Sequence, residues 1–185
     1  MTDIYRKHLG SLDIVGDAGS FPSHAELVRT LLGHGGYATL TTLTDDGHPY
    51  GSLVAYSVLA DGSPLVCISE IAEHTRNARR NAAGGLFVAA PAVPDVDPMD
   101  AARVSLVGEL APYDAQPDEI DRHLAVQPGA AAYHEWDDFG WWRLSISSAR
   151  YVGGFGIMSW IEGDAIAAAQ RDPVAAASAA AVAHM

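Results

Sequence analysis

Three arginines stand close together in an otherwise acidic chain. Arg76, Arg79 and Arg80 lie within five residues, although the sequence holds only 11 Lys and Arg against 23 Asp and Glu, a net charge of -12. The polar side chains just before them are Ser69, His74 and Thr75. Hydroxyls and arginines where a strand ends and a helix begins can bind phosphate or carboxylate, because free backbone N–H groups and guanidinium forks favour anions. The same spacing also fits a solvated helix face, so the residues alone leave both interpretations open.

Histidines and tryptophans offer further chemistry, but with weaker patterns. None of the eight histidines shows the spacing of a zinc motif. His74 belongs to the polar segment and is the best functional candidate, and His34 lies in a Gly-rich turn from which it could approach a ligand. The histidines expected to be exposed are His8, His24, His48 and His123. The tryptophans late in the chain are expected in the core or a dimer interface, and a planar cofactor at that interface would use them too.

Composition excludes several classes of protein. A general nucleic-acid binder needs a basic face, which this acidic chain does not offer. The single cysteine, Cys67, rules out an internal disulfide and fits a reducing cytoplasm. No run of residues resembles a secretory signal or a membrane span. We therefore expect a cytoplasmic protein without nucleic-acid or membrane partners.

The elements that must position these residues can be predicted from local patterns. Ser23 and Glu26 have the spacing of a capping box and predict a helix up to Gly33. Two Asp-Gly pairs predict hairpin turns between three strands. Residues 71–83 are predicted to be a loop entering a helix, and another helix begins at Pro117. The predicted strands are residues 37–44, 49–59, 64–69, 85–92 and 102–113, with one or two more in 139–156.

Short strands with helices inserted late predict a mainly β, α+β fold: a six- to seven-stranded barrel with peripheral helices. The expected divisions of the chain are an N-terminal arm (1–22), a barrel domain (23–161) and an Ala-rich helical tail (162–185). In the tail, Asp164 is predicted to cap one short helix and Asp172-Pro173 to begin a second.

Two motifs carry a resemblance to a known family. The segments Gly51–Tyr56 (GSLVAY) and Ile68–Asn77 (ISEIAEHTRN) resemble the "GS.V.Y" and "ISE.AEHTRN" signatures of HugZ-type haem-utilisation proteins. These proteins are a branch of the pyridoxamine 5'-phosphate oxidase-like, FMN-binding split β-barrels. ARYVGGFG (149–156) resembles the closing strand of the family, and the likeness covers roughly residues 25–160. The resemblance implies a split β-barrel that forms a homodimer, with a small-molecule cofactor at the subunit interface.

The resemblance also implies site residues. Contacts to an FMN phosphate or a haem propionate would be Ser69, His74, Thr75 and Arg76. The wall beside the planar ring would be Gly51, Ser52, Leu53 and Val54. Arg76 or Arg150 would lie at a propionate or beside the iron. Many relatives carry a further helical domain with a histidine ligand to iron. The final residues of this sequence resemble the first residues of that domain, cut short at His184-Met185. His184 is therefore the candidate metal ligand.

Three functions follow as alternatives. The first is a haem-binding protein, with oxidative haem degradation for iron utilisation as a candidate activity. The second is an oxidoreductase that uses FMN or a deazaflavin; the Arg/His pattern that true pyridoxamine phosphate oxidases use for substrate is missing, which disfavours vitamin B6 chemistry. The third is a barrel without catalysis that serves as a binding or regulatory module, because a fold does not fix a function. Whether the chain is an enzyme is left open.

Overall fold

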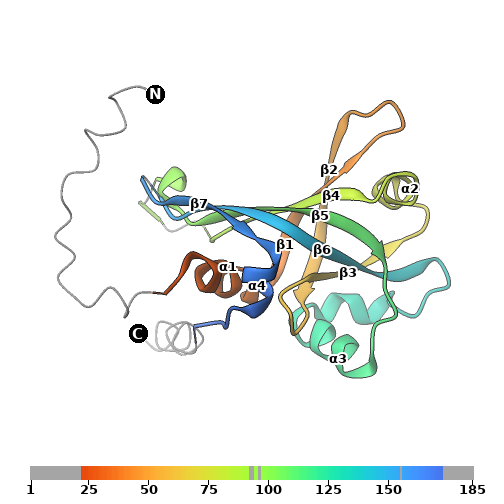
Figure 1. Ribbon diagram of the computed structural model, residues 1–185. Helices are drawn as coiled ribbons and strands as arrows, with labels where there is room; N and C mark the ends of the chain where they lie inside the picture. Colours follow the sequence, from red (N-terminus) through yellow and green to blue (C-terminus); the bar gives the residue numbers. More distant parts are fainter. Residues whose placement is uncertain (1–21, 92–93, 96, 155, 173–185) are drawn as a thin grey trace.

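A seven-stranded antiparallel sheet forms the body of the protein (Figure 1). The computed structural model describes residues 22–91, 94–95, 97–154 and 156–172. The strands are β1 (Gly36–Leu43), β2 (Pro49–Val58), β3 (Pro64–Ser69), β4 (Ala83–Ala89), β5 (Arg103–Pro112), β6 (Phe139–Val152) and β7 (Met158–Glu162). Their order is β3-β2-β1-β4-β5-β6-β7, and β3 also pairs with β6. The first six strands therefore close into a barrel, and β7 extends the sheet beyond β6.

Helices cover the openings and one side of this barrel. They are α1 (His24–Gly33), α2 (Glu73–Arg80), α3 (Pro117–Val126) and α4 (Gly163–Ala168), with short 3-10 helices η2 (Pro98–Asp100) and η3 (Pro128–Ala132). Figure 1 shows α2 beside the β1–β2 hairpin, with α1 and α4 next to each other and away from α2. In the described part of the chain, no helix is long and apolar enough to cross a bilayer.

Local turn and cap chemistry explains the first half of the fold. The capping box before α1 is present: Ser23 N donates to Glu26 at 2.7 Å, and Glu26 N donates to the Ser23 hydroxyl at 3.3 Å. Gly47 and Gly62 occupy the two hairpin turns with φ of 82° and 91°, the left-handed region that favours glycine. The three predicted strands and the hairpins between them are thus confirmed, with bounds shifted by one residue.

The barrel closes through a bulge and close strand approaches. Val107 pairs with Ser148 but Gly108 pairs with Ile146, so one residue of β6 is extra at this point. A Cβ on Gly108 would lie 1.9 Å from the carbonyl oxygen of Ser145. Only glycine fits here without moving the backbone, and the bulge lies between the part of β6 that pairs with β7 and the part that pairs with β3.

The barrel interior is filled by alternate residues of the strands. The largest wholly buried side chains include Trp142 of β6 and leucines from β1, β4, β5 and β6. Val28 and Leu32 of α1 are also completely buried, so α1 closes one opening of the core. At α2, the buried Asn77 donates to the Thr42 hydroxyl at 3.1 Å, which satisfies a polar group that would be costly to leave unpaired.

The barrel is split along β2. Tyr56, Ser57 and Val58 pair with β3, whereas residues 49–55 pair with β1 alone within the described chain. The outer half of β2 therefore has a free edge beside α2. The sequence prediction of a mainly β split barrel with six or seven strands and peripheral helices is confirmed.

The C-terminal part differs in detail from the prediction. β7 lies beyond the predicted 139–156 segment, because the Gly-rich turn returns the chain onto β6. Asp164 lies in the first turn of α4 instead of capping it; the N-cap is Glu162. Gly163 is the first residue of α4. It must be a glycine, because a Cβ there would lie 2.0 Å from the carbonyl oxygen of Ile146. The arm at 1–21, the helix predicted from Asp172-Pro173 and the end of the tail fall outside the described residues.

Candidate functional site

A row of facing residues crosses the outer side of the sheet from β2 to β7. The strand registers place its members directly opposite one another: Leu53, Thr39, Phe87, Ser105, Arg150 and Trp160. We call this set the outer row. Leu53 is 76% exposed, Trp160 62% and Phe87 41%, which is unusual for large apolar side chains on a closed sheet.

The outer row borders a shallow hollow of about 370 Å³ over β1, β4 and β5. Gly84, Gly85, Phe87 and Val107 line it, and the absence of side chains on the two glycines helps to form the depression. A Cβ on Gly85 would come within 2.7 Å of the Leu106 carbonyl oxygen, so the strands approach too closely there for a larger residue. The result is an apolar, open surface next to exposed aromatic rings.

Arg150 is the one charged member of the outer row. Its guanidinium carbon lies 5.8 Å from the centroid of the Trp160 ring, in a cation–π arrangement. Among the residues that the structure describes, no carboxylate forms an ion pair with it. A half-buried arginine held on an indole and lacking an acidic partner can receive an anion that lies across the apolar row.

The hydroxyls of the predicted anion cradle are already used to build the turn from β3 to α2. The Ser69 hydroxyl donates to Asp138 at 2.9 Å and accepts from the Ile71 N–H at 3.3 Å. Thr75 is completely buried, and its hydroxyl donates to the Ser69 carbonyl at 2.7 Å. Glu70 N also donates to the Asp138 carbonyl at 2.6 Å, so Asp138 holds this turn on both its side chain and its backbone.

All three clustered arginines have an acidic partner, and two of them make further contacts that fix the side chain. Arg79 pairs with Glu70 at 2.6 Å, and its guanidinium lies 5.3 Å from the Trp142 ring centroid. Arg80 donates to the Asn77 side chain at 2.6 Å and lies 3.6 Å from Asp45 in the hairpin turn. These contacts tie α2 to the core and to the β1–β2 hairpin. For Arg79 and Arg80, the structure supports the helix-face interpretation more than the anion site.

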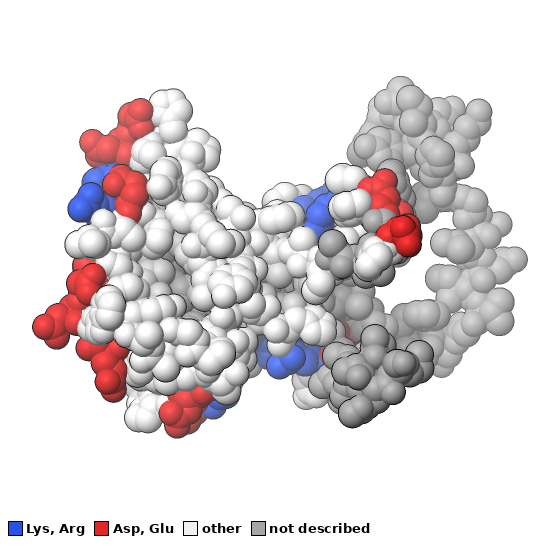
Figure 2. Space-filling view, turned by 180° about the vertical axis from the view of Figure 1, so that it is seen from behind, with Lys and Arg blue, Asp and Glu red and all other residues white. Residues whose placement is uncertain are grey.

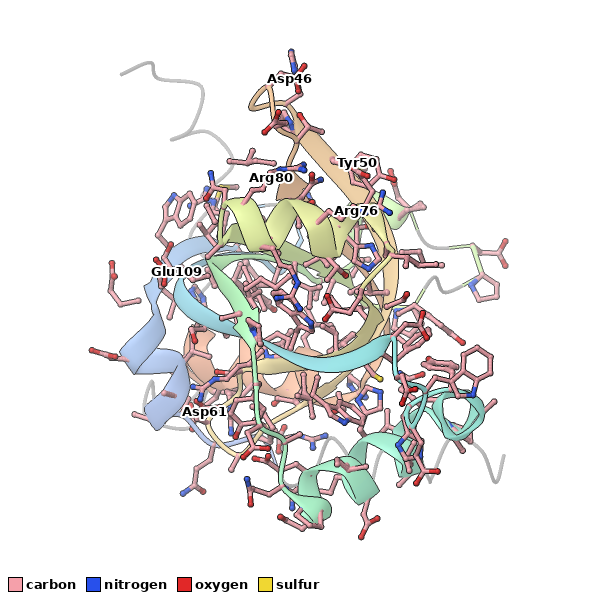
Figure 3. The ribbon with its side chains drawn as sticks, turned by 90° about the vertical axis from the view of Figure 1, so that its right-hand side faces the viewer. Asp46, Tyr50, Asp61, Arg76, Arg80 and Glu109 are labelled. Atoms are coloured by element: carbon pink, nitrogen blue, oxygen red, sulfur yellow. The ribbon has the colours of Figure 1, made fainter. Side chains whose placement is uncertain are left out.

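Arg76 is held less tightly. Its side chain is 56% exposed and lies 3.7 Å from Glu73, the longer end of the ion-pair range. Figure 3 shows Arg76 and Tyr50 on the same side of α2, with Arg80 toward the other end of the helix. Arg76 therefore stands at the free edge of β2, where a ligand anion could reach it.

The exposure of the histidines differs in part from the sequence prediction. His48 is exposed as expected, but His24 is half-buried and bonded to the Ser159 hydroxyl at 2.6 Å. His123 is completely buried, so the prediction that it is exposed was wrong. His74 is half-buried, its Nε2 atom has no hydrogen-bond partner among the described residues, and burial lowers its pKa. His184 lies outside the described residues.

The four wall residues of β2 point in two directions. Gly51 and Leu53 face outward with the outer row, whereas Val54 is 5% exposed and belongs to the core. Ser52 is half-buried and lies on the same inward face of β2 as Val54, opposite the buried Leu40 of β1. The fold brings three of the predicted site residues, Gly51, Leu53 and Arg150, onto the outer face; Ser69, His74, Thr75 and Arg76 gather at the α2 turn.

Sequence patterns missed Phe87, Trp160 and Asp138. Phe87 and Trp160 join the outer row only through the strand registers, and Asp138 meets Ser69 across 69 sequence positions. The one local signal was alternation: an apolar residue at an outward position of a strand marks exposed apolar surface.

Charge is distributed unevenly over the surface. Figure 2 shows that, on the face seen from behind, most Asp and Glu lie along the left edge, a smaller group lies at the right, and uncharged residues cover the centre. The net charge of -12 thus leaves room for uncharged surface on which an apolar ligand or another subunit could lie.

Comparison with known proteins places the chain in a family. A family model described as "CREG, beta-barrel" matches residues 20–167. The chloroplastic heme oxygenase HOZ of Arabidopsis thaliana is 29% identical over 136 residues, which is 71% of this chain but only 41% of HOZ. The chain thus spans less than half the length of this curated relative.

Solved structures agree with that placement. A heme binding protein from Mycobacterium smegmatis is 37% identical, with a TM-score of 0.81 over 89% of this chain and 68% of that one. ChuZ of Campylobacter jejuni has a TM-score of 0.65 over 75% of this chain and 58% of its own, but at 20% identity it supports the fold alone. The resemblance drawn from the ISEIAEHTRN region is confirmed, and the chain belongs to the CREG β-barrel family.

Proposed function

We propose that this protein binds haem on the outer face of the sheet, with the porphyrin against the outer row and a propionate at Arg150. The observation that carries this proposal is an arginine stacked on an exposed tryptophan, without an acidic partner among the described residues, in a row that also exposes Leu53 and Phe87. The names of two relatives, a heme oxygenase and a heme binding protein, support the same ligand.

The residues present fit the chemistry of haem. A porphyrin needs flat apolar surface on its faces and cations near its carboxylates. Leu53, Phe87 and Trp160 supply exposed apolar surface, and the hollow beside Phe87 supplies depth. Arg150 supplies the cation, and a guanidinium pairs well with a carboxylate when water is partly excluded.

Arg76 is the proposed second cation. Its exposed guanidinium stands at the free edge of β2, while Gly51 and Leu53 lie on the outward side of the same strand. Ser69 and Thr75 would act by shaping the turn before Arg76, since both hydroxyls have internal partners. His74 stays a candidate contact through its unpaired Nε2 atom, and His184 stays the predicted iron ligand.

We propose that the binding unit is a homodimer with the cofactor between the subunits. One copy leaves the outer row open to water on one side, and the hollow has no cover in the described chain. Exposed apolar patches of this kind mark interfaces, and two identical patches can pack about a two-fold axis. A second copy would supply the missing wall for a planar ligand.

Bound haem would supply the iron and the oxygen chemistry. The protein's own residues would hold the propionates and shield the ring from bulk water. Oxidative degradation of the bound haem is the activity to test, because HOZ is named a heme oxygenase. The site fits a flavin phosphate less well than haem. The Ser69 and Thr75 hydroxyls that would bind the phosphate already donate to Asp138 and to the Ser69 carbonyl.

The test is a titration of the full chain with haemin and, separately, with FMN. We expect a sharp Soret band that saturates at about one haemin per subunit, and no binding of FMN. Arg150→Gln should weaken haemin binding about tenfold or more, as for loss of a charge-assisted hydrogen bond. Arg122→Gln, which removes an exposed arginine paired with Asp118 on α3, should leave it unchanged.

Two results would overturn the proposal. Broad, non-saturating haemin absorption together with a perturbed flavin spectrum would make this a flavoprotein. Saturable haemin binding that Arg150→Gln and Arg122→Gln affect equally would place the ligand away from the outer row. If haem binds, loss of Soret absorbance with oxygen and a reductant then tests degradation.

A further inference from the structure

Helix α3 is fixed to the barrel through a histidine. Of its ten residues, His123 is the only one that is fully buried, with none of its surface exposed. The apolar residues on either side, Ile120 and Leu124, are only partly covered, and Val126 is 45% exposed. A helix normally docks through a stripe of apolar side chains, so α3 depends unusually on one polar ring.

The environment of His123 suits the neutral imidazole. Its Nδ1 atom lies 2.8 Å from the hydroxyl of the buried Ser57, and its ring meets Trp141 edge-on at 4.9 Å between centroids. Its Nε2 atom is buried and has no hydrogen-bond partner in the described structure. A proton added to Nε2 would create a buried charge with nothing to accept its N–H, which costs several kcal/mol in such sites.

Among the residues that the structure describes, no carboxylate lies close enough to compensate a charge on His123. The titratable groups facing this pocket are His134, whose ring lies 6.3 Å from Trp141, and Cys67 and Tyr133, whose pKa values are raised by burial. Of the carboxylates on α3, Asp121 is exposed to solvent, Asp118 pairs with Arg122, and Glu119 accepts from Tyr113 and the Gln116 N–H. Burial, and then His134, lowers the pKa of His123 to about 4.

The segment that His123 holds covers a defined surface. Trp141 of β6 lies beside the buried Cys67 of the neighbouring strand β3, its partner in the strand register. Just past α3, the buried Gln127 donates to the Gly36 carbonyl at 2.7 Å and the Tyr56 carbonyl at 3.0 Å. This second tie reaches the start of β1, next to the exposed Tyr37 of the outer face.

We propose that α3 and η3 form an acid-released cover over the β3–β6 face, and that a proton on His123 opens it. The open form would accept the proton in water, uncover Trp141 and Cys67, and release the Gln127 tie to β1. The inference rests on packing alone and does not depend on haem binding.

The direction of the pH effect follows from linkage. The pKa of His123 in the closed form is below the ordinary value of about 6.5. The closed cover is therefore fully stabilised above pH about 6.5, and this stabilisation is lost as the pH falls toward about 4. Opening should precede unfolding of the barrel, because the described residues include no fully buried carboxylate and no other fully buried histidine.

The test measures histidine titration and amide protection in the same intact protein. NMR of histidine-labelled protein should show His123 titrating well below pH 6.5. Hydrogen exchange rates, corrected for their intrinsic pH dependence, should show that residues 117–134 lose protection over the same pH range. Strands β1, β4 and β5 should stay protected. His123→Gln should abolish the pH dependence of this protection, and the exposed His48→Gln should preserve it.

The proposal is contradicted if residues 117–134 stay protected down to pH 4, or if they lose protection only together with the barrel strands. A pH step that persists in His123→Gln would assign the effect to another group, with His134 first to examine. Should His123→Gln fail to fold, the titration and exchange of the unaltered protein still decide, because a His123 midpoint near 6.5 excludes the mechanism.

Discussion

Arg150 of β6 lies over the indole of Trp160 of β7, 5.8 Å from its ring centroid, because the two residues face each other in the strand register. This contact fixes a cation on the apolar outer face of the sheet, 50 positions or more along the sequence from the β4 and β2 residues that share the row.

Trp160 should contribute to haemin binding both directly and by positioning Arg150. Replacing it with alanine removes an exposed apolar wall and the cation–π contact, so we expect about tenfold weaker binding with little change in stability. The matched control is Trp136→Ala, which removes a similarly exposed tryptophan (60%) outside the outer row. Equal losses in the two variants, measured by Soret titration, would count against the outer row as the site.

Thr75 and Arg76 are neighbours with opposite expected effects. Thr75→Val removes a buried hydrogen bond to the Ser69 carbonyl and should lower the free energy of unfolding by about 1–2 kcal/mol. Arg76→Gln removes only an exposed, long ion pair and should change stability by less than about 0.5 kcal/mol, yet weaken haemin binding. Urea unfolding and haemin titration of both variants check this; a destabilised Arg76→Gln with normal binding would reverse the assigned roles.

The dimer prediction depends on the outer face. Phe87→Glu places a charge in the middle of the outer row and should convert the dimer to a monomer in sedimentation experiments. Ile71→Glu is the control, since Ile71 is more exposed (70%) but lies in the turn before α2. A protein that is monomeric without any substitution, or dimeric in both variants, would show that the outer row is not the interface.

The glycine at the β5–β6 bulge should be irreplaceable. Gly108→Ala forces a Cβ to within 1.9 Å of the Ser145 carbonyl oxygen, so we expect a loss of more than about 2 kcal/mol in unfolding free energy. Gly129→Ala, where no atom lies within 4 Å of the added Cβ, should change it by less than about 0.5 kcal/mol. Chemical denaturation of the pair gives the comparison directly, and similar stabilities would mean that the bulge relaxes freely.

Cys67 should be unreactive in the folded protein. Burial raises the pKa of its thiol to about 11, so only about one molecule in a thousand carries the thiolate at pH 8. With 8% of its surface exposed, it should react with thiol reagents far more slowly than after unfolding in denaturant. Rapid modification at pH 8 would show that α3 opens readily even when His123 is neutral.

Local chemistry allowed much of the fold to be predicted. The Ser23–Glu26 capping box and the two Asp-Gly turns involve residues three or fewer positions apart, so the sequence contains the whole interaction. Strand registers are different, because they depend on which strands meet after the chain closes. The bulge at Gly108 and the addition of β7 to β6 therefore could not be predicted from any window of sequence.

The candidate site shows the same limit. The ISEIAEHTRN segment was recognisable, yet the internal partners of Ser69 and Thr75 depend on Asp138 and on burial. Leu53, Phe87, Arg150 and Trp160 come from four strands, so no local pattern joins them. His123 was placed on the surface because histidines near helix ends usually are exposed; only the fold shows Ser57 and Trp141 around it.

The most direct test of the haem site is a crystal structure of the haemin complex, with the iron located by its anomalous scattering. We predict that the iron lies over the outer row, between two subunits, with a propionate on Arg150 and the ring against Phe87. Iron located under α3, or a haem that contacts only the Ser69–Arg76 turn and leaves Arg150 and Trp160 uncovered, would contradict this account.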